Sequence, residues 1–361
     1  MKSRSRLADV ACLAGVSTAT VSAVVNNADG GNIRVSAETR QRVWDAVAQL
    51  GYVANPAART LAGGKNRILG IFTYEPIFPF QHHDFFHPFL LGIEEEAEAQ
   101  GYQLLLFTHA TDGAGRRSVY HNDNNLLYAA DGSILLGLNE NKAELRRLQE
   151  EGYPFVYVGR RDVPGLSISF TAADYTSAAA ELTHRLVELG HRRLIYIAPP
   201  PRIESSIDRE AGFIQAREQC GLSPQETPIL HISAAGLTPE KVREIVGAGI
   251  SGAIVEFDDQ CQAILQALHF LGIAVPRDFS IVMLGDPHYA WDHSLDWTMF
   301  TIPRREMGSE AVRLLVQRLA HPEDLTPLSV SLPCQVIPGQ TIAPPHPTPI
   351  NLRKEADILE T

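Results

Sequence analysis

Several polar side chains of this sequence stand just after runs of apolar residues, where loops are expected to begin. Asp174 comes shortly after "SISF", Asp258 follows "AIVEF", and Asp286 lies two residues after "SIVML". Arg209 opens the helical stretch "DREAGF" behind a proline-rich segment. Carboxylates accept hydrogen bonds, and the arginine guanidinium donates them as a rigid fork. Side chains of these types favour binding the oxygens of a small polar molecule.

Each of these residues also has a plainer interpretation. Arg209 could form a surface salt bridge, and Asp174 could cap the helix that follows it. Phe85 and Phe86, in "HDFF", could line the rim of a cleft, where aromatic faces suit the apolar side of a sugar ring. They could equally be ordinary core residues. The sequence leaves these alternatives open.

The sequence does not support an enzyme, a cofactor or a metal site. It contains no GxSxG, P-loop or HExxH motif. His83 and His87 are four residues apart near His82, but Pro88 follows and a second ligand cluster is missing. The four cysteines are far apart and form no CxxC pair, so we expect buried thiols in a reducing compartment. We predict a non-enzyme without cofactor or metal.

Apolar strands that alternate with amphipathic helices should position the candidate binding residues. The expected strands are 68–72, 102–107, 133–137, 155–159, 194–198, 253–257 and 280–284. Helical segments such as "NKAELRRLQEEG" and "SAAAELTHRLVELG" separate them. This alternation predicts doubly wound parallel sheets with helices on both faces. About 270 residues suit two α/β lobes, with ligands bound beyond the carboxyl ends of the strands.

The first 54 residues predict a small all-α domain. Leu7, Val10, Ala11 and Ala14 share one helix face, and Gly15 can adopt the positive φ that ends this helix. Ser17 can cap a second helix with Val21, Val24 and Val25 on its inner side, and Ser36 can cap a third. A helix, a glycine turn and a capped second helix form a helix-turn-helix.

The second helix leaves a row of small polar and methyl-bearing side chains on its outer side. Such groups fit the DNA major groove, because methyl groups can contact thymine and hydroxyls can bind phosphate. The predicted DNA-contact residues of this domain are Ser17, Thr18, Ala19, Thr20, Ser22, Ala23 and Asn26.

Residues 55–66, "NPAARTLAGGKN", predict a hinge between the head and the rest of the chain. Asn55 can cap a short helix, and Pro56 suits its first position. A helix this short is unstable alone in water and needs a surface on which to fold. Leu61 would then be an apolar wedge for a DNA minor groove. The alternative is a flexible linker.

The charge distribution also favours DNA as the partner of the head. Met1–Arg67 contain nine basic and four acidic residues, whereas the whole chain has a net charge of −11. A basic head on an acidic body indicates a polyanion that binds only the head. The start of the chain lacks the apolar core of a signal peptide, and no run is long enough to span a membrane. We expect a cytoplasmic protein.

Residues 7–66 resemble the LacI–GalR family of bacterial repressors. The similarity lies in "DVACLAGVS", "TVSAVVN", "VSAETRQRV" and "LGYVANPAARTL". It implies that Thr18 and Ala19 read base edges and that Ala58 and Leu61 enter the minor groove. Ala23 stands where the family more often has arginine, and the loop "NADGGNIR" is longer than usual. These departures leave the operator sequence undetermined but do not change the expectation of DNA binding.

The resemblance extends more loosely to about residue 345. It implies a body like that of a sugar-binding periplasmic protein, in which the chain crosses three times between two lobes. We place these crossings near Gly190, Ile302 and Leu328. The expected domains are 1–54, 55–66 and 67–345, with a disordered tail over 346–361. Lobe 1 would comprise about 67–189 and 303–327, and lobe 2 about 190–302 and 328–345.

The resemblance also implies a ligand site between the lobes. "DREAGF" matches the family's "R..GF", whose arginine holds ligand oxygens, and Asp258 matches a retained aspartate. Phe257 replaces the usual asparagine, and Gly285 stands where the family has the first of two aspartates. These departures indicate an altered pocket. The predicted ligand residues are Phe85, Phe86, Asp174, Arg209, Phe257, Asp258 and Asp286.

Together these features predict a DNA-binding transcriptional regulator, and we expect a repressor. A homodimer would present two helix-turn-helix units to a palindromic operator in double-stranded DNA. A small-molecule effector, expected to be a carbohydrate, would control operator affinity from the cleft. The alternative is a transport-type sugar-binding protein without DNA regulation.

Overall fold

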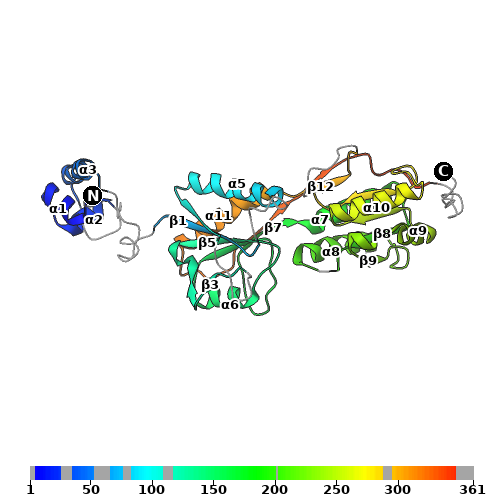
Figure 1. The fold of residues 1–361 in the computed structure, drawn as a ribbon, viewed down its shortest axis with the longest axis horizontal. Coiled ribbons are helices and arrows are strands. Elements are labelled where there is room, and N and C mark those ends of the chain that lie inside the picture. Colours follow the sequence, from blue (N-terminus) through cyan, green and yellow to red (C-terminus); the bar gives the residue numbers. More distant parts are fainter. Residues whose placement is uncertain are drawn as a thin grey trace. The chain divides into compact units, whose positions relative to one another are not determined.

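The computed structural model describes residues 5–25, 35–52, 66–75, 83–108, 117–200, 202–287 and 295–346. The chain divides into two compact units, a head of Met1–Ile68 and a body of Leu69–Thr361 (Figure 1). Of the predicted site residues, Asn26, Asn55, Ala58 and Leu61 lie outside the described residues. The hinge up to residue 65 and the tail beyond residue 346 lie outside them too.

The head is the predicted helix-turn-helix. Its helices are α1 (Leu7–Ala14), α2 (Thr18–Val25) and α3 (Ala37–Leu50). Their apolar sides form one small core, whose fully enclosed members are Val10, Val21, Val24 and Val43. Because these residues come from all three helices, the core fixes the angle between α1 and α2.

Local signals set the ends of the head helices as the sequence predicts. Gly15 adopts φ 65° after α1, and Gly51 adopts φ 55° after α3, a region that strains residues with a Cβ. The Ser17 hydroxyl accepts a hydrogen bond from the Thr20 N–H at 3.1 Å, and Ser36 accepts one from Thr39 at 3.2 Å. Both serines therefore cap their helices.

The body contains two parallel-type α/β sheets, which confirms the predicted fold class. In the first lobe the described strands run in the order β13-β7-β6-β5-β1-β2. In chain order these strands are β1 (Ile68–Thr73), β2 (Gln103–Phe107), β5 (Gly132–Leu136), β6 (Phe155–Val158), β7 (Phe170–Asp174) and β13 (Ser329–Pro333). Helices α5 (His83–Ala99) and α11 (Arg304–Ala320) cover one face, and α6 (Lys142–Glu150) covers the other. A small hairpin, β3 (Tyr120–His121) and β4 (Asn124–Asn125), precedes the short helix η2 (Leu126–Ala129).

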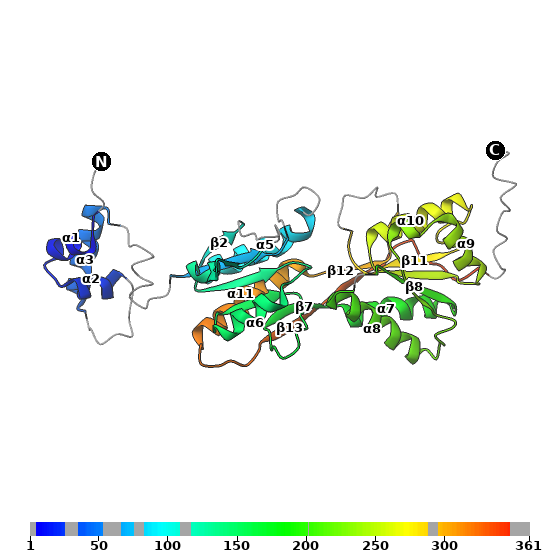
Figure 2. The same ribbon diagram turned by 60° about the horizontal axis from the view of Figure 1, so that its bottom comes forward.

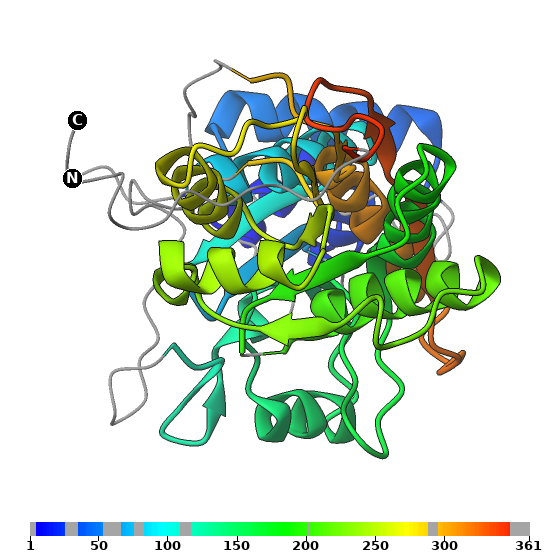
Figure 3. The same ribbon diagram turned by 90° about the vertical axis from the view of Figure 1, so that its right-hand side faces the viewer.

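The second lobe repeats this arrangement. Its described strands run in the order β14-β12-β11-β10-β8-β9. In chain order these strands are β8 (Leu194–Ala198), β9 (Ile229–His231), β10 (Gly252–Val255), β11 (Ser280–Met283), β12 (Met299–Thr301) and β14 (Gln335–Ile337). Helices α7 (Tyr175–Glu188) and α8 (Glu204–Gln219) pack on one face. On the other face lie η3 (Ala234–Gly236), α9 (Pro239–Gly247) and α10 (Asp258–Phe270), and Figure 3 shows helices on both sides of the strands.

Side-chain alternation explains the two covered faces of each sheet. In β1, Leu69 and Ile71 pack against α5 and α11, whereas Phe72 faces the core that contains α6. In β8, Ile195 and Ile197 face α9 and α10, whereas Tyr196 faces α7 and α8. Because helices cover both faces of these strands, neither face carries the polar residues that solvent exposure would require. The sequence of each strand is therefore a continuous apolar run.

The chain crosses between the lobes at three places, and two differ from the predicted ones. The first crossing lies at the junction of β7 and α7, near residue 174, because α7 packs in the second lobe through Ala178, Leu182 and Leu186. The predicted crossing near Gly190 was therefore too late. The crossing between β12 and α11 agrees with the prediction near Ile302.

The third crossing lies between β13 and β14, at about residue 334, rather than near Leu328. The difference arises because β13 pairs in parallel with β7 and so completes the first sheet before the chain leaves it. The next strand, β14, pairs antiparallel with β12 in the second sheet. Figure 2 shows this orange-red segment continuing from one lobe into the other.

Close contact between α5 and α11 fixes one wall of the space between the lobes. A Cβ on Gly92 would lie 1.8 Å from the carbonyl oxygen of Arg305, and one on Gly308 would lie 2.2 Å from that of Phe89. The two helices can approach this closely only because both positions lack a side chain. The start of α11 is thereby held against the first turns of α5.

Within the described residues, no single helix is long and apolar enough to cross a membrane. Helices α1 and α2 reach that length and composition only as a pair, with a bend of 103° between them.

Candidate ligand-binding cleft and DNA-contact surface

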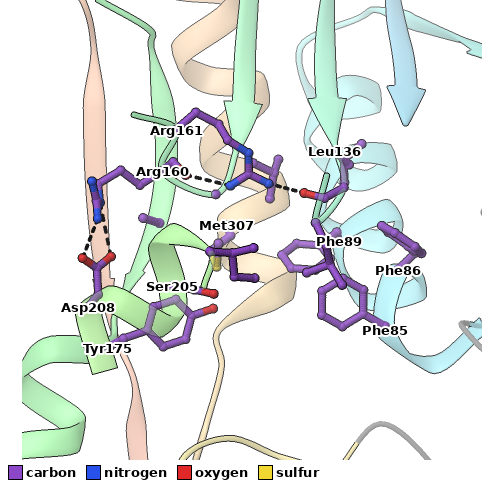
Figure 4. Close-up of a pocket in the computed structure, with 16 residues that line it drawn as sticks. Phe85, Phe86, Phe89, Leu136, Arg160, Arg161, Tyr175, Ser205, Asp208 and Met307 are labelled. Atoms are coloured by element: carbon purple, nitrogen blue, oxygen red, sulfur yellow. Dashed lines mark hydrogen bonds and ion pairs between the residues drawn. The ribbon is translucent and has the colours of Figure 1, made fainter. Parts of the chain in front are cut away.

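A cavity that is open at its mouth lies where the carboxyl ends of strands from both lobes meet (Figure 4). Its first-lobe lining comes from the start of α5, the loops after β5 and β6, and the first turn of α11. Its second-lobe lining comes from Tyr175 and from the start of α8. The lining residues are Phe85, Phe86, Phe89, Leu136, Gly137, Leu138, Val158, Gly159, Arg160, Arg161, Ala172, Tyr175, Ile203, Ser205, Asp208 and Met307.

Strand order explains why the cavity forms here. In the first sheet the chain runs from β1 outward to β2 and then returns to β5 on the other side of β1. In the second it runs from β8 to β9 and then to β10 on the other side of β8. Loops that leave neighbouring strands in opposite directions open a crevice at the carboxyl ends. The two crevices face each other across the lobe junction.

An ion pair joins the lobes across this cavity. Arg160, just after β6, donates from Nη2 to Asp208 Oδ1 at 2.7 Å and from Nε to Oδ2 at 3.2 Å. Asp208 lies on α8 of the second lobe. This two-point contact uses the Nε–Nη2 edge of the guanidinium, which matches the shape of a carboxylate.

A second, more buried arginine lies beside this pair. Arg161 is 3.3 Å from Glu140 of the first lobe and 3.7 Å from Glu204 of the second, measured between nitrogen and oxygen. Glu204 also accepts a hydrogen bond from the Asp162 N–H at 3.0 Å. Burial raises the pKa of Glu140, an effect that Arg161 opposes and the negative charge of Glu204 reinforces. This edge of the cavity holds the lobes together through charges that are all paired.

Aromatic rings form the opposite wall. Phe85 packs edge-on against Phe86 and Phe89, with ring centroids 5.0 Å and 5.7 Å apart. In Figure 4 these three rings group on one side of the cavity, and Tyr175, Ser205 and Asp208 lie on the other. Phe85 and Phe86 lie on the first turn of α5, which begins at His83, rather than in a loop before Pro88. An aromatic wall of this kind suits the apolar face of a sugar ring.

Arg209 occupies a buried position next to the cavity. It is 3 % exposed, which excludes the alternative of a surface salt bridge. Its Nε donates to the Leu284 carbonyl at 2.8 Å and its Nη1 to the Ser205 carbonyl at 3.0 Å. The guanidinium carbon lies 3.9 Å from the centroid of the Tyr175 ring. No carboxylate of the described residues pairs with it, so stacking and backbone carbonyls stabilise this charge.

The other four predicted ligand residues do not line the cavity. The Asp174 carboxylate caps α7 by accepting from the Ser177 N–H at 3.0 Å, which is the alternative that the sequence left open. The Phe257 ring centroid is 5.8 Å from the Arg209 guanidinium carbon. Asp258 is buried at the start of α10. Asp286 accepts from the Ile302 N–H at 2.9 Å and pairs with Arg304.

Sequence reasoning missed several residues of the cavity. Arg160 and Arg161 directly follow the predicted strand 155–159, so their place at a carboxyl strand end could have marked them. Asp208 is the residue before Arg209 in the quoted "DREAGF". Tyr175 and Met307 carried no such signal, because only the packing of α7 and α11 brings them to the cavity.

The predicted DNA-contact residues of the head that the structure describes lie on one side of α2. Ser17, Thr18 and Ala19 are exposed, and Thr20, Ser22 and Ala23 are half-buried. Ser17 and Thr20 are joined through their hydroxyls at 2.8 Å. The core-facing Val21 and Val24 are fully buried, so the polar residues remain on the outer side. Their contact with DNA stays a prediction.

Comparisons with known proteins agree with both units. The model of bacterial regulatory proteins of the lacI family matches residues 6–55. The model of periplasmic binding proteins and the sugar binding domain of the LacI family matches 76–236, and that of periplasmic binding protein-like domains matches 183–342. The HTH-type transcriptional regulator CelR of Thermobifida fusca is 31 % identical over 326 residues, which cover 88 % of this chain and 92 % of CelR. The chain belongs to the LacI family of bacterial regulatory proteins.

Other relatives and solved structures support this assignment. The HTH-type transcriptional repressor CytR of Escherichia coli strain K12 is 27 % identical over 324 residues, 86 % of this chain and 89 % of CytR. A structure of the CelR–cellobiose complex has a TM-score of 0.60 and 26 % identity, and covers 94 % of this chain and 100 % of that one. The lac repressor dimer bound to operator and the anti-inducer ONPF has a TM-score of 0.68 at 21 % identity, covering 94 % and 100 %. This LacI-family chain is a transcriptional regulator with a DNA-binding head, and the relatives named here are regulators, not enzymes.

Proposed function

We propose that this LacI-family regulator is a repressor that binds a palindromic operator as a homodimer and that a carbohydrate in the lobe cleft controls its operator affinity. The observation that carries the proposal is the cavity itself. It combines an aromatic wall with polar side chains, and both lobes contribute to it. A ligand held there contacts both lobes and therefore stabilises one angle between them.

The composition of the cavity supports a carbohydrate. Sugars present an apolar ring face and a rim of hydroxyls, which need aromatic surface and hydrogen-bonding groups together. Phe85 and Tyr175 supply rings from opposite lobes, and Ser205 and Arg160 supply polar groups. The relative CelR is named in a complex with cellobiose, a disaccharide.

The head supports DNA reading by α2. Its outer residues Thr18 and Ala19 are small and exposed at the first turn, where side chains and the free N–H groups of a helix can approach a groove. The fully buried valines hold α2 at a fixed angle to α1. These features favour α2 as the helix that enters the major groove.

Coupling between the sites requires that effector and operator prefer different lobe arrangements. The chain crosses the lobe junction three times, at about residues 174, 303 and 334, so rotation of one lobe moves three strands together. A ligand shifts the equilibrium only by its difference in affinity for the two arrangements. The ion pairs of Arg160 and Arg161 belong to the arrangement seen here.

The first experiment is thermal unfolding of the full chain with a panel of sugars that begins with cellobiose. A ligand at about 100 times its Kd adds roughly 2.7 kcal/mol of stability. An operator selected from random palindromic duplexes is then titrated with and without the sugar that binds. Loss of operator affinity on adding that sugar supports the proposal. Sugar binding without any selected operator supports the transport-type alternative, and operator binding that no sugar changes contradicts effector control.

Variants of α2 test the DNA-reading residues separately. Replacing Thr18 by alanine should weaken operator binding by about tenfold, since a good base contact contributes roughly 1–3 kcal/mol. Sugar binding should not change. Gln49→Ala, in the exposed last turn of α3, is the matched control. Equal operator affinity for both variants would remove Thr18 from the contact surface.

A further inference from the structure

Arg304 is buried but only partly paired. It is the first residue of α11 and 6 % exposed. Its Nη1 pairs with the Asp286 carboxylate. Its Nε and Nη2 are buried and have no hydrogen-bond partner among the residues that the structure describes. Unsatisfied donors of a buried cation are costly, so this arrangement needs an explanation.

Nε and Nη2 form one edge of the guanidinium, the edge that binds a carboxylate at two points. Three other arginines of this protein use that edge in this way. Arg160 binds Asp208 with it, Arg305 binds Glu95 at 2.8 and 2.6 Å, and Arg277 binds Asp278 at 3.0 and 2.7 Å. Among the described arginines, Arg304 is the one whose whole Nε–Nη2 edge is buried without a partner.

Arg304 does not itself line the cavity but lies directly next to a residue that does. The guanidinium carbon of Arg304 lies 5.3 Å from the centroid of the Phe85 ring, and Phe85 lines the cavity. Met307, one turn further along α11, lines it too. One aromatic side chain therefore contacts both the cavity and the guanidinium, and a ligand group would reach the Nε–Nη2 edge only after Phe85 moves aside.

The charges around this edge leave a place for an anion. Arg304 and Arg209 both lie near Tyr175. Burial raises the pKa of Tyr175, and the positive charges of the two arginines oppose this rise. Asp286 is the one carboxylate among the described residues that pairs with either guanidinium. Asp174, which also lies in this region, already accepts the Ser177 N–H. Of the two buried cations, Arg304 therefore pairs with a carboxylate and Arg209 pairs with none of the described ones.

We propose that the effector carries a carboxylate or phosphate group and that the Nε–Nη2 edge of Arg304 binds it at two points. The proposal rests on the effector role proposed above and narrows its ligand to an acidic sugar. A single hydroxyl oxygen does not span the two donors of this edge. It also carries no negative charge to balance the guanidinium of Arg209, which has no paired carboxylate among the described residues. An acid group satisfies both donors and balances the charge.

Matched ligand pairs test the acid group. Isothermal titration of the full chain compares cellobiose with cellobionate, the same disaccharide oxidised to a carboxylate at its reducing end, and glucose with glucuronate and with glucose 6-phosphate. In at least one pair we expect the acid to bind tenfold to a hundredfold more tightly than the neutral sugar, the range for hydrogen bonds to charged groups. The glucuronate and phosphate arms show which anion the site takes.

Variants assign the effect to Arg304. Arg304→Met should abolish the preference for the acid, and Arg304→Lys should keep only part of it, because an ammonium ion has no fork. Arg305→Met removes the neighbouring exposed arginine and should leave the preference unchanged. If Arg304→Met fails to fold because Asp286 loses its partner, the double variant Arg304→Met/Asp286→Asn, which removes both charges, is titrated in place of the single variant.

The outcomes separate the two proposals. If sugars bind and the neutral member of every pair binds as tightly as its acid, the acid-binding role is overturned and the carbohydrate effector remains intact. An acid preference that survives in Arg304→Met also overturns the role of Arg304. If no member of any pair binds, the carbohydrate effector and the acid group both fail.

Discussion

The body contains two clusters of buried or half-buried arginines, and different groups stabilise their positive charges. In the bridging cluster, Arg160 and Arg161 pair with carboxylates of both lobes. In the stacked cluster, Arg209 and Arg304 lie against the rings of Tyr175 and Phe85, and among the described residues only Arg304 has a carboxylate partner, Asp286. The first cluster pairs its charges within the protein and joins the lobes, and its one donor without a hydrogen bond, Arg161 Nε, lies 3.3 Å from Glu140. The second cluster leaves both donors of the Arg304 Nε–Nη2 edge without a hydrogen-bond partner among the described residues.

The largest effect should follow removal of the most enclosed bridging cation. Arg161→Met removes the arginine partner of Glu140 and Glu204, whose side chains are only 11 % and 10 % exposed, and leaves Glu140 only the more distant Lys142 at 3.7 Å. Breaking a buried ion pair by removing one partner costs about 3–5 kcal/mol of unfolding free energy. Urea unfolding measures the loss. Arg305→Met, which breaks an exposed pair, should cost less than about 1 kcal/mol, and equal losses for the two variants would contradict the comparison.

Removal of a stacked cation should cost less stability than removal of Arg161. Arg209→Met leaves two carbonyl oxygens, of Leu284 and Ser205, without their donor but strands no carboxylate. We expect a loss of about 1–3 kcal/mol in the same urea assay. A loss larger than that of Arg161→Met would show that the stacked cluster is structural, in conflict with its role at a binding site.

The Arg160–Asp208 pair should contribute a smaller, measurable coupling between the lobes. The two side chains are 31 % and 25 % exposed, so solvent screens their attraction. A double-mutant cycle with Arg160→Gln and Asp208→Asn should give a coupling free energy of about 0.2–1 kcal/mol. A coupling of zero would mean that the ion pair does not favour the lobe arrangement seen here. The cycle with Arg313→Gln and Glu310→Gln, a pair within α11, is the control.

The smallest effect should come from Glu140 and should depend on pH. Because the folded state raises its pKa, the ionised carboxylate costs stability at neutral pH. Glu140→Gln should therefore make the protein slightly more stable at pH 7, and the difference should vanish as pH falls below the pKa of an ordinary glutamate. Arg161, Lys142 and Glu204 are the charged neighbours. Urea unfolding at pH 7 and pH 4 tests the sign, and a variant less stable at pH 7 would contradict it.

Much of the fold followed from local sequence patterns. Each of the seven predicted strands is present with ends that differ by at most two residues, because strands buried on both faces read as uninterrupted apolar runs. Helices α2 and α3 begin at serine caps, and α1 and α3 end at glycines with positive φ; both signals are visible in the sequence. The half-buried edge strand β13 was missed, since its alternating burial leaves only a weak apolar signal.

The lobe boundaries and the cavity were harder to predict. Gly190 marks the end of a helix, but the end of a helix does not reveal which sheet the helix packs against. Ala178 and Leu182 of α7 fit against Phe213 and Tyr196 of the second lobe, and only that packing moves the crossing to residue 174. The predicted acids Asp174 and Asp258 likewise lie at helix starts beside the cavity and not on its surface.

The sequence by itself determined the helix-turn-helix head, the alternating α/β body and the family, because caps, turns and apolar periodicity are local. Tertiary structure decided which charges are satisfied. The sequence alone does not distinguish the four arginines of these clusters, Arg160, Arg161, Arg209 and Arg304. Their hydrogen-bond partners come from segments up to 75 residues away in the chain. Whether a guanidinium bridges two lobes or keeps an empty edge beside a cavity depends on those long-range contacts, which only the packed lobes provide.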